Sequence, residues 1–162
     1  MLVKSAAVLI GILDKQIILT RRAADLRSFT GQVCLPGGKF DSEDIDFSAT
    51  AQREFREEVY FAGIIEPLFS LLPECSVVSR QKVYPLVAKL NGEIQGFSPS
   101  EVARLFYLPL DVLQPELFTI NPEYPHIQHN LCFNYDNEFI WGLTAYILYH
   151  FSIYHKKYFE NL

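Results

Sequence analysis

The segment of residues 53–58, which reads REFREE, constrains this chain more than any other, because it sets three acids and two arginines in a stretch with helical spacing. That spacing extends over residues 47–61. Ala51, Phe55 and Val59 recur at every fourth position there, which is typical of the buried stripe of an amphipathic helix. We therefore predict a helix over residues 47–61 that packs on a core through these three side chains.

The acids of this helix predict a metal site. Glu54, Glu57 and Glu58 stand at positions i, i+3 and i+4, so they project from one face and repel one another by a few tenths of a kcal/mol per pair. A divalent cation would offset that repulsion, and Mg²⁺ prefers carboxylate oxygens, water and substrate phosphate as ligands. Arg53, four residues before Glu57, can pair with that carboxylate and orient it. A solvated acidic face would explain the acids alone; the preceding Gly37-Gly38 favours a site, because glycine lets the backbone approach a metal or phosphate closely.

The rest of the chain has the pattern of short strands separated by turns. Asp46 or Ser48 could cap the predicted central helix, and residues 35–38 (LPGG) are typical of a loop. Predicted strands cover residues 4–13, 16–21, 64–72, 83–90 and 106–108, a hairpin joins 131–135 to 138–141, and a final helix runs from 142 to about 158. This order predicts an α/β (α+β) fold with helices packed on the faces of a mixed sheet.

Length and composition indicate one globular domain over residues 1–162. A net charge of −5 argues against a nucleic-acid partner or an anionic membrane partner, and the apolar runs at 6–13 and 140–154 are shorter than the roughly 20 residues that span a bilayer. Three scattered cysteines without a CxxC pair argue against a disulfide scaffold or structural zinc and favour reduced thiols in a cytoplasmic protein. Residues 1–40 carry a net +4 and residues 41–60 a net −5, as an anionic substrate held through a cation would require.

Together, Gly38, five residues, Asp44, a spacer and Arg-Glu-x-x-Glu-Glu resemble the Nudix box, here about residues 38–61. The resemblance implies a Nudix-type α/β/α sandwich with a mixed β-sheet between helices. It also implies that Glu54, Glu57 and Glu58, with the Gly38 carbonyl, bind catalytic Mg²⁺ or Mn²⁺. Two departures leave the role of Asp44 and the exit of the helix open. Asp44 replaces the usual Glu and is followed by eight residues instead of seven before the Arg, and Tyr60 stands where the family usually has Gly.

A second signature precedes the box and is similar to the pattern of the coenzyme A diphosphatase branch of the Nudix family. It consists of Leu19-Thr20-x-Arg22-Ala23, Arg27, Gly31 and Leu35-Pro36-Gly37-Gly38, and residues 98–110 and 141–145 look similar as well. That branch splits coenzyme A into 3′,5′-ADP and 4′-phosphopantetheine. The resemblance implies that Arg22 and Arg27, which could instead be surface arginines at a strand end, bind phosphate together with Gly37, Gly38 and Lys39.

Several alternatives remain open from the sequence. Glu58 or Glu101 could accept the proton of the attacking water, and Glu101 could equally be an acid at a helix start. The substrate could be ADP-ribose, NADH or another nucleoside diphosphate derivative, or the chain could be a catalytically silent Nudix domain. The terminal helix could form a homodimer face. His126 and His129 are more typical of a polar loop than of a metal site, and Cys34 of a packed small residue than of a nucleophile.

Overall fold

The computed structural model describes residues 4–24, 31–76, 80–125, 130–154 and 156–159. Its main element is a mixed sheet that, within these residues, has eight strands. They are β1 (Ser5–Leu13), β2 (Gln16–Arg22), β3 (Val33–Cys34), β4 (Gly37–Lys39), β5 (Val59–Ser70), β6 (Glu74–Cys75), β7 (Lys82–Phe97) and β8 (Val102–Pro109). The predicted α/β (α+β) class is confirmed.

The sheet has the order β3-β2-β1-β7-β5, with β4 on β1, β6 on β7 and β8 on β2. Strands β1 and β7 are parallel, and the other pairs are antiparallel. The predicted turn between β1 and β2 is confirmed: Asp14 and Lys15 have φ angles of 50° and 64°, as a two-residue hairpin turn requires.

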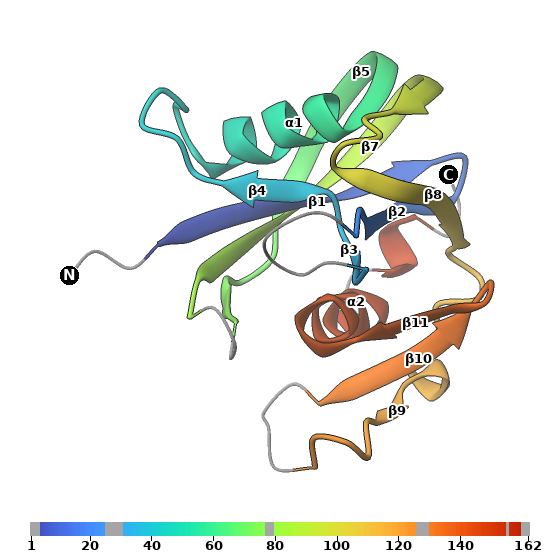
Figure 1. Cartoon of the computed structure of the whole chain (residues 1–162). Helices are drawn as coiled ribbons and strands as arrows, with labels where there is room; N and C mark the ends of the chain where they lie inside the picture. The colour runs from blue at the N-terminus through green and yellow to red at the C-terminus, as the bar shows by residue number, and fades with distance from the viewer. Residues whose placement is uncertain (1–3, 25–30, 77–79, 126–129, 155, 160–162) are drawn as a thin grey trace.

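Two helices cover opposite faces of this sheet, α1 (Phe47–Glu58) and α2 (Gly142–Tyr154), as Figure 1 shows. Successive residues of β1 alternate between the two sides, because side chains of a strand point to opposite faces. Leu9 belongs to the core cluster that contains Phe55 of α1, and Ile10 belongs to the cluster that contains Leu148 of α2. The predicted layers, with a mixed sheet between helices, are therefore present.

A smaller sheet lies next to α2 (Figure 1) and consists of β9 (Thr119–Ile120), β10 (Leu131–Tyr135) and β11 (Glu138–Trp141). The predicted hairpin is confirmed at both bounds, and its turn residues Asp136 and Asn137 have φ angles of 52° and 61°. Short 3-10 helices occur at Pro115–Leu117 and Lys156–Tyr158. In the described part of the chain, no helix is long and apolar enough to cross a membrane.

Several predicted bounds were wrong. The central helix ends at Glu58 instead of residue 61, because Val59 is extended and pairs with Phe97 of β7. Strand β5 therefore begins at residue 59 instead of 64, β7 extends seven residues past the predicted end, and β8 covers more than 106–108. The predicted loop at 35–38 was wrong for its glycines, which enter β4 and pair with β1. The last helix ends at Tyr154 instead of near 158.

Candidate functional site

Helix α1 positions the predicted acids by fixing its opposite side in the core. Ala51, Phe55 and Val59 are fully buried, which confirms the predicted stripe. Asp46 caps the first turn, because its Oδ1 accepts a hydrogen bond from the Ala49 N–H at 2.8 Å. Anchored at its start and along one side, α1 directs the acids of its last turn and a half toward β4, which lies beside it (Figure 1).

Arg53 is the centre of an ion-pair network on this side of the helix. Its Nε and Nη2 donate to the two Asp44 oxygens at 3.0 Å each, and its Nη1 donates to Glu54 Oε1 at 3.0 Å and Glu57 Oε1 at 3.3 Å. The Thr50 hydroxyl also donates to Asp44 at 2.8 Å. Hydrogen bonding to Arg53 holds the pKa of Asp44 well below its usual range. Asp44 thus holds Arg53 in place despite the longer spacer, and Arg53 orients Glu54 and Glu57.

Glu58 is the most buried acid of the cluster, with 5% of its surface exposed. Burial raises the pKa of this carboxyl to about 8, although the charge of Arg22 and a hydrogen bond from the Gly37 backbone both lower it. The negative charges of Glu54 and Glu101 raise the pKa of Glu58 further. Two acids, Glu54 and Glu101, and one arginine, Arg22, therefore act on the Glu58 carboxyl, while Arg53 pairs with Glu54.

The two glycines of β4 allow the strand to lie directly against this cluster. A Cβ atom on Gly38 would stand 2.4 Å from the Glu54 carboxyl carbon, and one on Gly37 would stand 2.2 Å from the Ala7 carbonyl oxygen. A larger residue at position 38 would displace the Glu54 carboxylate, and one at position 37 would collide with the backbone of β1. Gly38 therefore allows close approach of the backbone to a carboxylate, and Gly37 allows close approach of β4 to β1.

A model of the NUDIX domain matches residues 3–130. This chain belongs to the Nudix family. Nudix hydrolases act on diphosphate bonds, generally with divalent metal ions, so the chain is a hydrolase of that kind. It is 36% identical to "Uncharacterized Nudix hydrolase NudL" of Pectobacterium atrosepticum over 93% of this chain and 82% of that protein. It is also 36% identical to the protein of the same name from Yersinia pestis, over 92% of this chain and 78% of that protein.

Solved structures of Nudix proteins share the fold. A Nudix hydrolase of Nitrosomonas europaea superposes with a TM-score of 0.56 at 18% identity, over 67% of this chain and 58% of that one. The MutT protein of Methanosarcina mazei gives 0.55 at 19% identity, over 68% and 79%. The MutT Nudix hydrolase of Burkholderia pseudomallei gives 0.52 at 21% identity, over 68% and 86%.

The acidic cluster of α1, which consists of Glu54, Glu57 and Glu58, has the chemistry that suits a divalent cation. Its donors are carboxylate oxygens, which hard cations prefer. Burial raises the pKa of Glu54, even though Arg53 lowers it, and it raises the pKa of Glu58 as well, so a cation bound here would favour the ionised form of both carboxyls. In their present arrangement, with Arg53 bound to Glu54 and Glu57, no three His, Cys, Asp or Glu side chains of the described residues converge as a metal cage.

The other predicted site residues have different outcomes. Arg22 and Glu101 are near Glu58, since the charge of each acts on its pKa, and Glu101 lies in a turn before β8 instead of at a helix start. Lys39 is exposed at the end of β4, where its carbonyl accepts from Arg53 Nη2 at 3.3 Å. Arg27, His126 and His129 lie outside the described residues.

Sequence reasoning did not place the start of α2 near the residues around Glu58. Burial raises the pKa of the Cys34 thiol to about 11, while the charges of Arg22 and Glu58 and a side-chain hydrogen bond with Thr144 also act on it. Thr144 lies three residues into α2, so this helix begins next to the residues around Glu58. The similarity of residues 141–145 to the branch pattern was the available signal, and the raised pKa agrees with a packed, unreactive thiol.

Proposed function

We propose that this Nudix hydrolase splits the diphosphate bond of coenzyme A or its derivatives, giving 3′,5′-ADP and 4′-phosphopantetheine. The observation that carries the proposal is the position of Arg22, a residue of the upstream signature, beside the buried Glu58. An arginine next to the acidic cluster suits a substrate that carries a diphosphate and a further phosphate, because arginine binds phosphate oxygens well. The NudL relatives, similar over 92–93% of this chain, support Nudix hydrolase chemistry, and the assignment to coenzyme A depends on the upstream signature.

In this proposal Glu54, Glu57 and Glu58, with the Gly38 carbonyl, hold Mg²⁺ or Mn²⁺. The bound cation supplies positive charge that neutralises the diphosphate and makes water more acidic. Arg53 keeps Glu54 and Glu57 oriented. Arg22, Arg27 and Lys39, together with the backbone of Gly37 and Gly38, bind the phosphates.

The reaction is an in-line attack of water on one phosphorus of the diphosphate. The new bond joins the water oxygen to that phosphorus, and the bridging P–O bond breaks, so the other phosphate leaves. A carboxylate accepts the proton of the water. Glu58 and Glu101 are the two candidates, and the single variants Glu58→Gln and Glu101→Gln distinguish them by which one changes the pH profile of kcat.

The test is chromatography of the products from coenzyme A, dephospho-coenzyme A, ADP-ribose and NADH, each incubated with Mg²⁺ or Mn²⁺. We expect coenzyme A to be split fastest, to 3′,5′-ADP and 4′-phosphopantetheine. Faster cleavage of ADP-ribose or NADH would leave the Nudix chemistry in place and overturn the coenzyme A assignment. Cleavage of none of them with either metal would favour a binding domain.

The variant Glu57→Gln tests the proposed metal ligands. We expect loss of turnover by several orders of magnitude with an unchanged thermal midpoint, because Glu57 is half exposed and its removal leaves no cavity. The matched control is Glu93→Gln, an exposed glutamate on β7, which should keep full activity. Near-normal turnover of the Glu57 variant would remove Glu57 from the set of metal ligands.

A further inference from the structure

Helix α2 packs on the sheet with one side and presents an uncharged second side to water. Residues 142–154 contain no Asp, Glu, Lys or Arg. The buried side consists of Ala145, Ile147, Leu148, Phe151 and Ser152, and the outer side of Tyr146, Tyr149, His150, Ile153 and Tyr154. Helix α1, in contrast, turns Arg56 and Glu57 to water, as a surface helix usually does. A helix without a charged side is typically covered all round.

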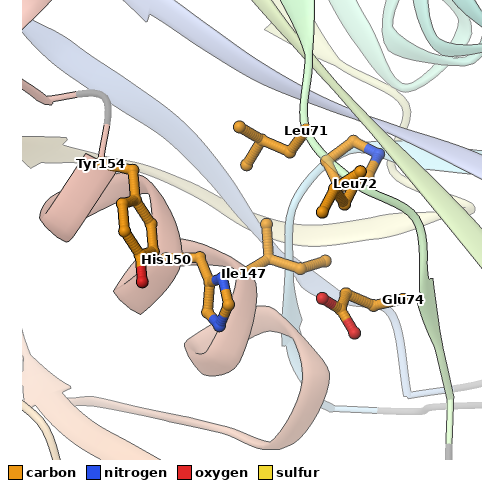
Figure 2. Close-up of a pocket in the computed structure, with 7 residues that line it drawn as sticks. Leu71, Leu72, Glu74, Ile147, His150 and Tyr154 are labelled. Carbon is orange, nitrogen blue, oxygen red and sulfur yellow. The ribbon is translucent and has the colours of Figure 1, made fainter.

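Neighbouring segments extend the outer side of α2 into a continuous face. A pocket of about 430 Å³ is lined there by Leu71, Leu72, Glu74, Pro85, Ile147, His150 and Tyr154, and Figure 2 shows how α2 faces the segment after β5 across it. Tyr158 lies at the edge of this region, since its ring centroid is 6.0 Å from that of Phe69 near the end of β5. We define the α2 face as Leu72, Tyr146, His150, Ile153, Tyr154 and Tyr158.

The α2 face exposes a large area for a single chain. Leu72 is 83% exposed, Tyr154 64% and Tyr158 70%. A tyrosine side chain presents roughly 150–250 Å², so the two tyrosines alone leave about 200–350 Å² in water. With Leu72 and Ile153 added, the face matches the largest apolar patch of a typical monomer, about 300–600 Å². A stable dimer buries about 800 Å² on each partner, so the α2 face can supply the apolar centre of such an interface.

The residue types of the α2 face fit a second copy of this chain. Interface centres are enriched in tyrosine and depleted in charged residues, as this face is. A projecting side chain, Leu72, stands beside a hollow in the same face, so a two-fold axis can bring each into contact with the other copy. Glu74 lines the pocket and Lys157 precedes Tyr158, so the charges beside the face are of opposite sign and add little repulsion between two copies.

We propose that the α2 face is the interface of a homodimer, in which α2 of one copy packs against α2 of the other around a two-fold axis. The inference does not depend on the substrate of the enzyme, because it uses no residue of the acidic cluster. Since α1 covers the opposite face of the sheet, both acidic clusters remain accessible in such a dimer.

The experiment is sedimentation velocity over a wide range of micromolar concentrations. We expect the native protein to have twice the 18.6 kDa mass of one chain. Tyr154→Glu places a carboxylate at the centre of the interface, at a side chain that is 64% exposed, so the monomer keeps its fold. The dissociation constant of the dimer should rise by at least about 30-fold, as for other central interface residues.

The matched control is Ile64→Glu, which adds the same charge on β5 outside the α2 face. Ile64 is 66% exposed, nearly the same as Tyr154, and this variant should remain dimeric. Circular dichroism of both variants checks that the fold is retained. A native protein that is monomeric throughout, or a dimer that Tyr154→Glu leaves intact, overturns the inference.

Amide hydrogen exchange of the native protein tests the same face without any substitution. We expect protection of residues 71–74 and 146–154 to increase with protein concentration, while protection of α1 stays constant. An increase confined to other segments would place the interface elsewhere and reject the α2 face. A monomer that co-sediments with phosphatidylglycerol vesicles would assign the face to a membrane surface and likewise reject the homodimer.

Discussion

At the scale of single residues, Glu58 is the buried acid on which the proposed cation site depends most. Its carboxylate lies against the Gly37 backbone, with Glu54 and Glu101 near it and Arg22 as the opposing charge. Because burial raises its pKa to about 8, ionised Glu58 opposes folding in the metal-free protein at pH values where an unfolded chain ionises freely. The cation that we propose at Glu58 would offset this cost.

The variant Glu58→Gln should therefore stabilise the metal-free protein while it reduces turnover. The folded pKa of Glu58 lies above its unfolded value of 4.5, so the contribution of Glu58 to stability is most favourable below about pH 4.5 and decreases as pH rises toward 8. The variant removes this decrease and should gain up to a few kcal/mol near pH 8, since each pKa unit corresponds to about 1.4 kcal/mol. Urea unfolding of both proteins from pH 5 to 8, first with a chelator present and then with Mg²⁺, measures this gain in the free energy of unfolding. Parallel pH curves for both proteins would contradict the expectation.

At the scale of elements, α1 shows what a short sequence can and cannot predict. Its buried stripe follows from local spacing and was predicted correctly, and Asp46 is one of the two caps that the sequence left open. The end of α1 at Glu58 was not predicted, because Val59 becomes extended by pairing with Phe97, which lies 38 residues away. The same pairing explains why Tyr60 can replace the usual glycine: the chain leaves the helix in an extended conformation and needs no left-handed residue.

The N-cap of α1 offers a test of how far helix stability and activity are separable. Asp46→Ala removes the acceptor for the Ala49 N–H and should reduce the free energy of unfolding by about 1 kcal/mol. Turnover below the unfolding transition should change little, because the helix stays fixed through Ala51 and Phe55. Asp46→Asn, which retains an acceptor, is the matched control. A large loss of kcat in Asp46→Ala without a loss of stability would show that the cap acts directly on the site.

At the scale of the whole molecule, the C-terminal part is joined to the main sheet through charges as well as through the apolar core. The family model ends at residue 130, whereas β10, β11 and α2 lie beyond it. Glu138 of β11 is 6% exposed, and its Oε1 accepts from Arg21 and from Arg104, each at 2.9 Å. The hairpin was predictable from its own residues, but this contact was not, because Arg21 lies 117 positions and Arg104 34 positions away.

Glu138→Ala should weaken the attachment of the β10–β11 hairpin to strands β2 and β8. The change leaves two arginines without their shared carboxylate at a partly buried site, and removing one member of such a group is more destabilising than losing an exposed ion pair. We expect the thermal midpoint to fall by several degrees and amide exchange in β10 and β11 to accelerate more than in β1 or β7.

Because α2 follows β11 directly and begins beside Cys34, KM for coenzyme A should rise more than kcat falls. Asp136→Asn, which changes only an exposed partner of Arg104, is the control and should affect both quantities less. Uniform acceleration of exchange across both sheets would instead show that Glu138 stabilises the fold as a whole, with no particular role in holding the hairpin.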